Sequence, residues 1–208
     1  MFKRKIFILI SFLLLGTIIF CSAKKIEKKS RKTENKKMLC IVPVGEVEHS
    51  VLLNLKLKLK EIFGLGVQIK EGLEKLDYAY NPERKQYFSS AILKKIKKGS
   101  YKECEKVLGI VDVDLYIPSL NFVFGEADID GKACVISLCR LKQSFYSLPE
   151  DQKLFEQRVL KEAVHELGHT FGLSHCPDPK CVMHFSNSLR DTDIKSHDFC
   201  KDCKKLLK

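Results

Sequence analysis

Three histidines at fixed spacing constrain the fold of this chain more than any other feature. His165 and His169 are four positions apart, so on a helix they lie on one face, about 6 Å apart along the axis, and can bind one ion. If the helix continued, His175 would face away from that ion. Gly172 lies where the chain must turn, because glycine adopts the left-handed conformation that ends a helix without a steric penalty. The pattern therefore predicts a helix, a turn and a three-histidine metal site.

A glutamate beside the first histidine gives this predicted site a catalytic form. Three protein ligands leave the fourth position of a tetrahedral zinc ion open for water, and zinc lowers the pKa of that water from ~15.7 to about 7. Glu166 is then placed to take the proton. The alternative, an ordinary amphipathic helix with surface histidines, does not explain why half of the six histidines lie between positions 165 and 175. We therefore favour a hydrolytic zinc site.

Four cysteines follow the histidines in two closely spaced pairs. Cys176 and Cys181 have four residues between them, and Cys200 and Cys203 have two, which are usual spacings for a structural Cys₄ zinc site. Disulfide pairing is the alternative, and export from the cytosol would favour it. The loop between the pairs, residues 185–198, is polar and has little apolar core of its own. A zinc ion would stabilise such a region, so we favour zinc.

The order of these residues resembles that of a known family. HExxHxxGxxH is the metzincin signature. Here it runs into Cys176-Pro-Asp-Pro-Lys-Cys181-Val-Met183, followed by Phe199-Cys200-Lys-Asp-Cys203. The combination resembles the archaemetzincin family of zinc metallopeptidases, and the similarity covers about residues 39–203. Its upstream segments are Ile41-Val-Pro-Val-Gly45, Asn81-Pro-Glu-Arg-Lys-Gln-Tyr87, Asp114-Leu-Tyr-Ile-Pro118 and Asn121-Phe-Val-Phe-Gly-Glu-Ala127.

This resemblance implies a role for each residue of the pattern, and it implies two zinc ions per chain. The histidines would hold a catalytic zinc ion, the glutamate would act as general base, and the four cysteines would hold a structural zinc ion. The methionine would form a turn beneath the catalytic site. These roles fall on His165, His169 and His175, on Glu166, on Cys176, Cys181, Cys200 and Cys203, and on Met183.

The resemblance also implies a substrate-binding edge. In zinc proteases of this broad type, an antiparallel edge strand lies beside the active-site helix and takes the substrate as an added strand. The candidates for this upper wall of the cleft are Phe122, Val123, Phe124 and Gly125. A plain sheet edge is the alternative. Glu126 and Asp128, near the same strand, could attract a substrate's free amino group.

Alternating helical and strand-like segments predict a layered α/β fold. Strands are expected at residues 40–44, 67–69, 108–113, 121–127 and 132–141, and helices at 46–63, 83–97 and 148–171. The second helix is expected to follow the Asn81-Pro82 pair. With the resemblance, this predicts a zincin-like mixed sheet with an antiparallel edge strand, an active-site helix and a small zinc-clipped C-terminal subdomain. Four further cysteines are expected to be buried thiols, namely Cys40, Cys104, Cys134 and Cys139.

The positive charge of the chain is concentrated before the predicted domain. Of the formal net charge of +11, a net +9 precedes residue 38, which leaves the remainder close to neutral. We therefore expect no nucleic-acid partner for the catalytic body.

The first residues have the form of a signal peptide. Lys3-Arg-Lys5 is followed by an apolar run at residues 6–20. Cleavage near Ala23, lipid attachment at Cys21 and retention as a membrane anchor are all open. We favour export or membrane association over a cytoplasmic location. The predicted organisation is therefore a signal peptide or anchor at 1–23, a basic disordered linker at 24–38 and a single peptidase domain at 39–208.

We expect a zinc-dependent metallopeptidase in which Glu166 assists the attack of zinc-bound water on a peptide bond. The sequence does not decide between aminopeptidase-like trimming and internal cleavage. The alternative is a zinc-stabilised binding protein with little catalytic activity. The expected partner is a peptide or protein substrate, and the chain is expected to be a monomer.

Overall fold

The computed structural model describes residues 37–207. The predicted leader at 1–23 and nearly all of the predicted linker lie outside these residues, so the structure does not test them. Within the described part of the chain, no helix is both long enough and apolar enough to cross a membrane.

A five-stranded mixed sheet forms the centre of the domain, with strand order β2-β1-β5-β8-β7. Its strands are β1 (Met38–Pro43), β2 (Gly66–Ile69), β5 (Lys106–Val111), β7 (Gly125–Ala127) and β8 (Ala133–Ser137). All neighbouring pairs are parallel except β7 and β8, which are antiparallel. The predicted mixed sheet with an antiparallel edge strand is therefore confirmed.

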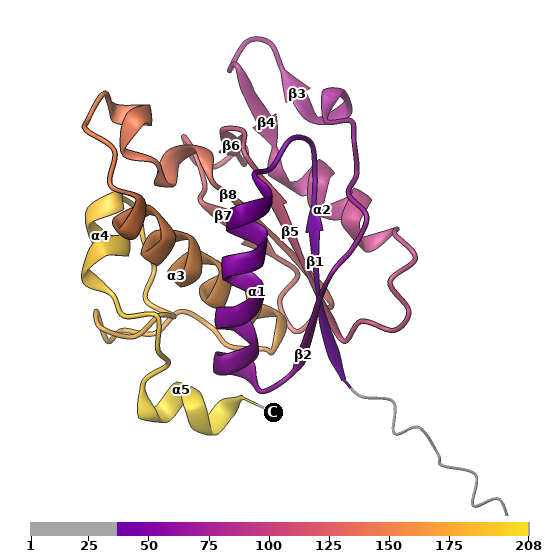
Figure 1. Cartoon of the computed structure of the whole chain (residues 1–208). Helices are drawn as coiled ribbons and strands as arrows, with labels where there is room; N and C mark the ends of the chain where they lie inside the picture. Colours follow the sequence, from indigo (N-terminus) through magenta and orange to yellow (C-terminus); the bar gives the residue numbers. More distant parts are fainter. Residues whose placement is uncertain (1–36, 208) are drawn as a thin grey trace, which may run out of the picture. The chain divides into compact units, whose positions relative to one another are not determined.

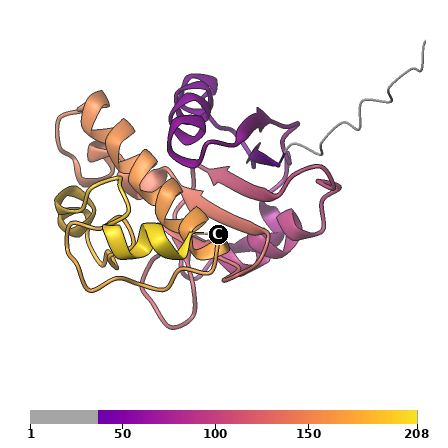
Figure 2. The same ribbon diagram turned by 90° about the horizontal axis from the view of Figure 1, so that it is seen from below.

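Helices cover both faces of this sheet (Figure 1). On one face lie α1 (His49–Phe63) and α3 (Gln152–Thr170), and on the other lies α2 (Ser89–Lys97). Alternation along β1 explains the two layers, because Leu39 and Ile41 pack with α1 and α3 while Cys40 and Val42 pack with α2. Two short helices, α4 (Leu189–Ile194) and α5 (Lys201–Leu206), complete the C-terminal region, and α5 lies near the C-terminal end of α3 (Figure 2).

The long helix α3 forms as the sequence predicts. Asp151 caps its first turn by accepting a hydrogen bond from the backbone N–H of Leu154 at 2.9 Å. Phe155, Val159 and other apolar side chains pack on the sheet. The helix ends at Thr170, and Gly172 has a φ of 86°, the left-handed conformation predicted for the turn.

The helix predicted at residues 83–97 begins only at Ser89, so the first part of that prediction is wrong. The Asn81 side-chain oxygen does cap backbone N–H groups, those of Glu83 at 3.0 Å and Arg84 at 3.1 Å, but the capped segment is a turn. The turn joins two strands of a small second sheet. That sheet consists of β3 (Tyr80–Asn81), β4 (Gln86–Phe88) and β6 (Leu115–Tyr116).

The two strands predicted around Gly131 form the β7–β8 hairpin, but both are shorter than predicted. Of residues 121–127 only the last three are in β7, and β8 ends at Ser137 rather than at residue 141. Cys139 therefore lies in a 3₁₀ turn (Cys139–Leu141) and not on the same strand as Cys134.

Two cysteines expected to be thiols form a disulfide instead. Cys40 on β1 is bonded to Cys104, which lies just before the neighbouring strand β5. The prediction failed because the two residues are 64 positions apart, and only strand order brings them together. Cys134 and Cys139 are unpaired, as predicted, but only Cys134 is buried, and Cys139 is half-buried.

The segment between the two cysteine pairs also differs from the prediction. Residues 185–198 were expected to be a polar loop, but they contain α4, whose first turn is capped by the Ser188 hydroxyl. The segment packs along α3 through charged side chains, and Leu189 adds a partly buried apolar contact with the core.

Candidate metal centre and active-site cleft

Three histidines converge at the C-terminal end of α3. His165 and His169 lie on its last turns, and the turn at Gly172 returns the chain so that His175 faces them. Their candidate ligand nitrogens all lie within 4.8 Å of one another. The Nε2 atoms of His165 and His169 are 3.2 Å apart.

Hydrogen bonds to backbone carbonyls show that these histidines fit a metal ion. Nδ1 of His165 lies 2.8 Å from the carbonyl oxygen of Val182, and Nδ1 of His169 lies 2.7 Å from that of Leu173. A carbonyl oxygen only accepts, so each Nδ1 carries the hydrogen and each Nε2 of a neutral ring presents a lone pair. Two lone pairs that face each other call for a shared cation, and three imidazoles are a donor set that suits zinc.

Burial keeps the rings of His165 and His169 in the form that binds metal, whereas His175 is the exposed member of the three. Loss of solvation is the largest cause that lowers the pKa of His165, of His169 and of His175. The effect is largest for His165, whose pKa lies well below its usual value. Neutral rings are the state that metal binding requires.

Glu166 lies buried against the edge strand β7. A Cβ atom added at Gly125 would lie 2.6 Å from Cγ of Glu166 and 2.7 Å from its Oε1. Glycine at this position therefore lets the glutamate approach the strand. Burial is the main cause that raises the pKa of Glu166, and the nearby Glu162 carboxylate raises it further.

A cleft of about 490 Å³ contains Glu166 and the three histidines. The four residues predicted for its upper wall, Phe122, Val123, Phe124 and Gly125, all line it, although only Gly125 belongs to β7. The sequence interpretation missed several other lining residues because nothing in their local pattern marks them. They include Ile117, Leu120, Ile129, Glu162, Phe185, Ser186 and Asn187.

Two arginines fix the upper wall. Arg84 donates from Nη2 to the carbonyl oxygens of Leu120 and Asn121, both at 3.0 Å. Arg140 forms a paired contact with Asp114, at 2.5 and 2.7 Å, and its guanidinium lies 4.3 Å from the ring centre of Phe122. The wall residues are thus held in place by contacts that run outside the cleft.

Met183 packs beneath the histidines. A Cβ added at Gly168, between the two helical histidines, would lie 2.4 Å from the Met183 sulfur. The Met183 carbonyl oxygen accepts a hydrogen bond from the backbone N–H of Cys176 at 2.9 Å. The methionine is fully buried, so the structure places it in contact with the helix and not in the cleft.

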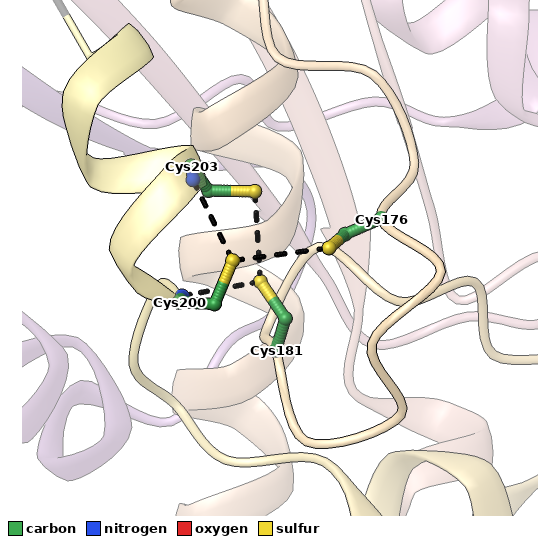
Figure 3. Close-up of side chains that lie close together, drawn as sticks. All are labelled: Cys176, Cys181, Cys200 and Cys203. Atoms are coloured by element: carbon green, nitrogen blue, oxygen red, sulfur yellow. Dashed lines mark hydrogen bonds between the residues drawn. The ribbon is translucent and has the colours of Figure 1, made fainter.

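The four cysteines of the two pairs come together in a second cluster (Figure 3). Their sulfur atoms lie within 4.8 Å of one another, and the closest pairs are Cys181–Cys203 at 3.7 Å and Cys176–Cys200 at 3.9 Å. All four are free thiols. The backbone N–H of Cys203 helps lower the pKa of the Cys200 thiol to about 7. A group of four sulfur atoms with an accessible thiolate fits a structural zinc ion.

Comparison with known proteins identifies the family. Residues 41–208 match the family model described as Peptidase family M54. The archaemetzincin of Methanocaldococcus jannaschii is 46% identical over 172 residues, which cover 81% of this chain and 92% of that protein. The chain belongs to the archaemetzincins, peptidase family M54. The archaemetzincin of Pyrococcus furiosus is also 46% identical, over 177 residues that cover 82% of this chain and 92% of that protein.

Solved archaemetzincin structures share this fold. The crystal structure from Methanopyrus kandleri superposes with a TM-score of 0.74 at 39% identity and covers 84% of this chain and 95% of that chain. The structure from Archaeoglobus fulgidus, solved with malonate, gives a TM-score of 0.71 at 36% identity and covers 81% and 99%. The resemblance and the zincin-like fold predicted from the sequence are therefore confirmed. The chain is a zinc metallopeptidase, a hydrolase that acts on peptides or proteins.

Proposed function

We propose that this archaemetzincin hydrolyses peptide bonds with Glu166 as the general base. The observation that carries the proposal is the juxtaposition of Glu166 and three converging histidines in one cleft beside an antiparallel edge strand. In this proposal His165, His169 and His175 hold the catalytic ion. A bound zinc ion would polarise the scissile carbonyl and acidify a water molecule.

Glu166 performs the proton transfers. Its carboxylate accepts a proton from the attacking water and passes it to the nitrogen of the leaving amine. Gly125 leaves room for this carboxylate at the strand edge. The substrate adds to the free edge of β7 as a further strand, and Phe122, Val123 and Phe124 bound its path.

Four cysteines hold a second, structural zinc ion, so the protein binds two ions per chain. The clustered sulfur atoms of Cys176, Cys181, Cys200 and Cys203 support this assignment. Met183 packs under the histidines and holds them in position. We expect the chain to act as a monomer.

One further observation favours aminopeptidase activity, that is, removal of residues from the amino terminus of a peptide. Glu126 lines the cleft, and its Oε2 atom is buried with no hydrogen-bond partner. This oxygen is the candidate acceptor for a peptide's free ammonium group. Asp128, the other carboxylate considered from the sequence, forms an ion pair with Lys97 at 2.6 Å. Acetylated peptides should therefore be cleaved more slowly than free ones.

The leader at 1–23 directs the protein out of the cytosol or to the membrane. The linker predicted at 24–38 ends before Met38, the first residue of β1, and the peptidase domain predicted at 39–208 begins with that strand. The Cys40–Cys104 disulfide supports export independently of the leader, because structural disulfides persist mainly in oxidising compartments.

The test of the proposed function is digestion of a mixed peptide library by the zinc-loaded full chain, with Glu166→Ala as the control. The wild type should cleave peptides, and the variant should keep its zinc but lose activity by about a thousandfold. A variant that cleaves at the wild-type rate contradicts the role of Glu166. If neither protein cleaves although both bind zinc, the alternative of a binding protein with little activity is correct.

A further inference from the structure

The cleft is acidic although the chain as a whole is basic. Three carboxylates line it, those of Glu126, Glu162 and Glu166, and no lysine or arginine is among its described lining residues. Glu166 is assigned to proton transfer and Glu126 to a free amino terminus. Glu162 has no role in the proposed reaction.

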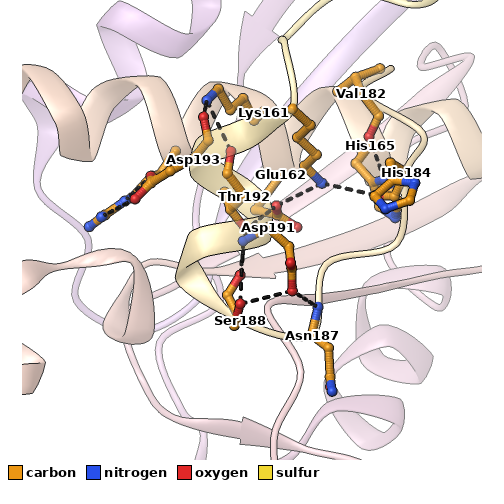
Figure 4. A network of polar contacts seen from close by, with 12 residues as sticks. Lys161, Glu162, His165, Val182, His184, Asn187, Ser188, Asp191, Thr192 and Asp193 are labelled. Atoms are coloured by element: carbon orange, nitrogen blue, oxygen red, sulfur yellow. Dashed lines mark hydrogen bonds and ion pairs between the residues drawn. The ribbon is translucent and has the colours of Figure 1, made fainter. Parts of the chain in front are cut away.

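Glu162 lies one helical turn before Glu166 on α3, about 6 Å away along the helix axis. It is a member of a polar network that joins α3 to α4 (Figure 4). Its Oε1 atom accepts a hydrogen bond from the Thr192 hydroxyl at 3.1 Å and lies 2.9 Å from the ammonium nitrogen of Lys195. The Lys195 side chain is 0% exposed, so a substrate cannot reach it.

The second oxygen of Glu162 has no such partner. No described residue donates a hydrogen bond to Oε2, yet Glu162 lines the cleft. The hydroxyl of Ser186, which also lines the cleft, is buried and lacks a hydrogen-bond partner. A hydroxyl as buried as that of Ser186 is costly without a hydrogen bond. The cleft therefore has an acceptor, from Glu162, and a hydroxyl, from Ser186, available for a group that donates several hydrogen bonds.

The network holds Glu162 in a fixed place. On the same face of α3, Arg158 forms a paired contact with Asp193, with both distances 2.7 Å, and Lys161 donates to the carbonyl oxygens of Thr192 and Asp193. These contacts dock α4 onto α3. A carboxylate held in this way can discriminate between ligands because it does not have to reorganise when one binds.

We propose that Glu162 determines specificity by binding the cationic side chain of a lysine or arginine residue in the substrate. Thr192 and Lys195 are positioning residues that hold one carboxylate oxygen and leave the other for the substrate. The proposal rests on the proposed peptidase function, since it places a substrate in this cleft. An ammonium or guanidinium group supplies several donors, and the Ser186 hydroxyl adds a second contact.

Equilibrium binding tests the proposal without requiring cleavage. The full chain carrying Glu166→Ala and loaded with zinc is titrated with acetylated peptides that differ only in having lysine or norleucine at one position, moved along the peptide. At one position lysine should bind about tenfold more tightly than norleucine. Adding Glu162→Gln should abolish this preference. Glu156→Gln, which removes a carboxylate of α3 outside the cleft, should leave it unchanged.

A second variant separates specificity from folding. Glu162→Gln leaves the buried Lys195 without a charged partner, which destabilises a protein, whereas Glu162→Gln with Lys195→Met removes both charges. The double variant should melt normally, retain its zinc and bind lysine and norleucine peptides equally. A lysine preference that survives in it overturns the proposal, as does the absence of any lysine preference in the parent protein.

The free amino terminus of a peptide is the other ammonium group that Glu162 could bind. If Glu162→Gln weakens the binding of free norleucine peptides but not of acetylated lysine peptides, Glu162 binds the terminal ammonium and the side-chain proposal is wrong. Failure of the peptidase function would be seen separately, as the absence of cleavage by the wild type in the digestion experiment.

Discussion

At the scale of single residues, the placement of the histidines depends on the missing side chain of Gly168. Replacing it with alanine would force the new Cβ to within 2.4 Å of the Met183 sulfur. Overpacking costs about 1–3 kcal/mol, and the better helix propensity of alanine offsets about 1 kcal/mol. We expect Gly168→Ala to lower the free energy of unfolding by about 1 kcal/mol and to weaken zinc binding about tenfold.

Thermal unfolding and zinc titration measure these two effects. The matched control is Gly66→Ala, because a Cβ added at Gly66 meets no atom within 4 Å. If Gly168→Ala binds zinc as tightly as the wild type, the packing of Met183 against α3 does not hold the ligands in place.

Two features of single residues, the turn at Gly172 and the pairing of Glu162 with Lys195, differ in how well the sequence predicts them. A continued helix would turn His175 away from His165 and His169, so the turn at Gly172 could be predicted from the sequence alone. The pairing of Glu162 with Lys195 joins residues 33 positions apart, and each looks like an ordinary surface charge in its own segment. Their burial depends on how α4 docks on α3. Patterns therefore predict residues that act through local geometry, and they miss those that act through tertiary contacts.

At the scale of elements, the C-terminal region should depend on its metal ion. Its sulfur atoms cluster around one point, and its only described helices are the short α4 and α5. We expect Cys203→Ser to reduce the zinc content by one ion and to make residues 184–207 sensitive to proteolysis, since structural zinc supplies much of the folding free energy of such regions. Metal analysis and limited proteolysis check both effects.

Cys139→Ser is the matched control for that experiment, because Cys139 is a free thiol outside the cluster. The effect should extend to the cleft, since the Val182 carbonyl that orients His165 lies next to Cys181. Zinc content that remains unchanged in Cys203→Ser would contradict the assignment of a structural zinc site.

Elements with a strong apolar period were predicted well, and the others were not. The helix α1 has buried leucines at helical spacing and a glycine at its end, and it matches the prediction closely. The start of α2 was placed too early because an Asn-Pro pair that caps a helix can equally cap a turn. The helix α4 was missed because an ion pair and hydrogen bonds hold it on α3, and Leu189 is the one residue of this helix that packs against the apolar core. Sequence periodicity therefore fails where a segment is held by charge.

At the scale of the whole molecule, the Cys40–Cys104 disulfide links the fold to the compartment in which the protein works. It joins two neighbouring parts of the main sheet across 64 residues of chain, a distance for which a disulfide stabilises a protein by about 4 kcal/mol. Replacing both cysteines with alanine should therefore lower Tm by about 10 °C. Cys134 is buried but forms no disulfide, so loss of its thiol does not remove a cross-link.

Cells that express the full chain, or a chain starting at Met38, test the link to export. The full chain should leave the cytosol, and its Cys40 and Cys104 should resist alkylation, because an oxidising compartment lets the disulfide form. The shorter chain should stay in the cytosol with both thiols alkylated and should show the same lowered Tm as the double alanine variant. Fractionation followed by mass spectrometry measures both properties. If the two chains appear in the same fraction with the same alkylation, the leader does not direct export and the disulfide does not report the compartment.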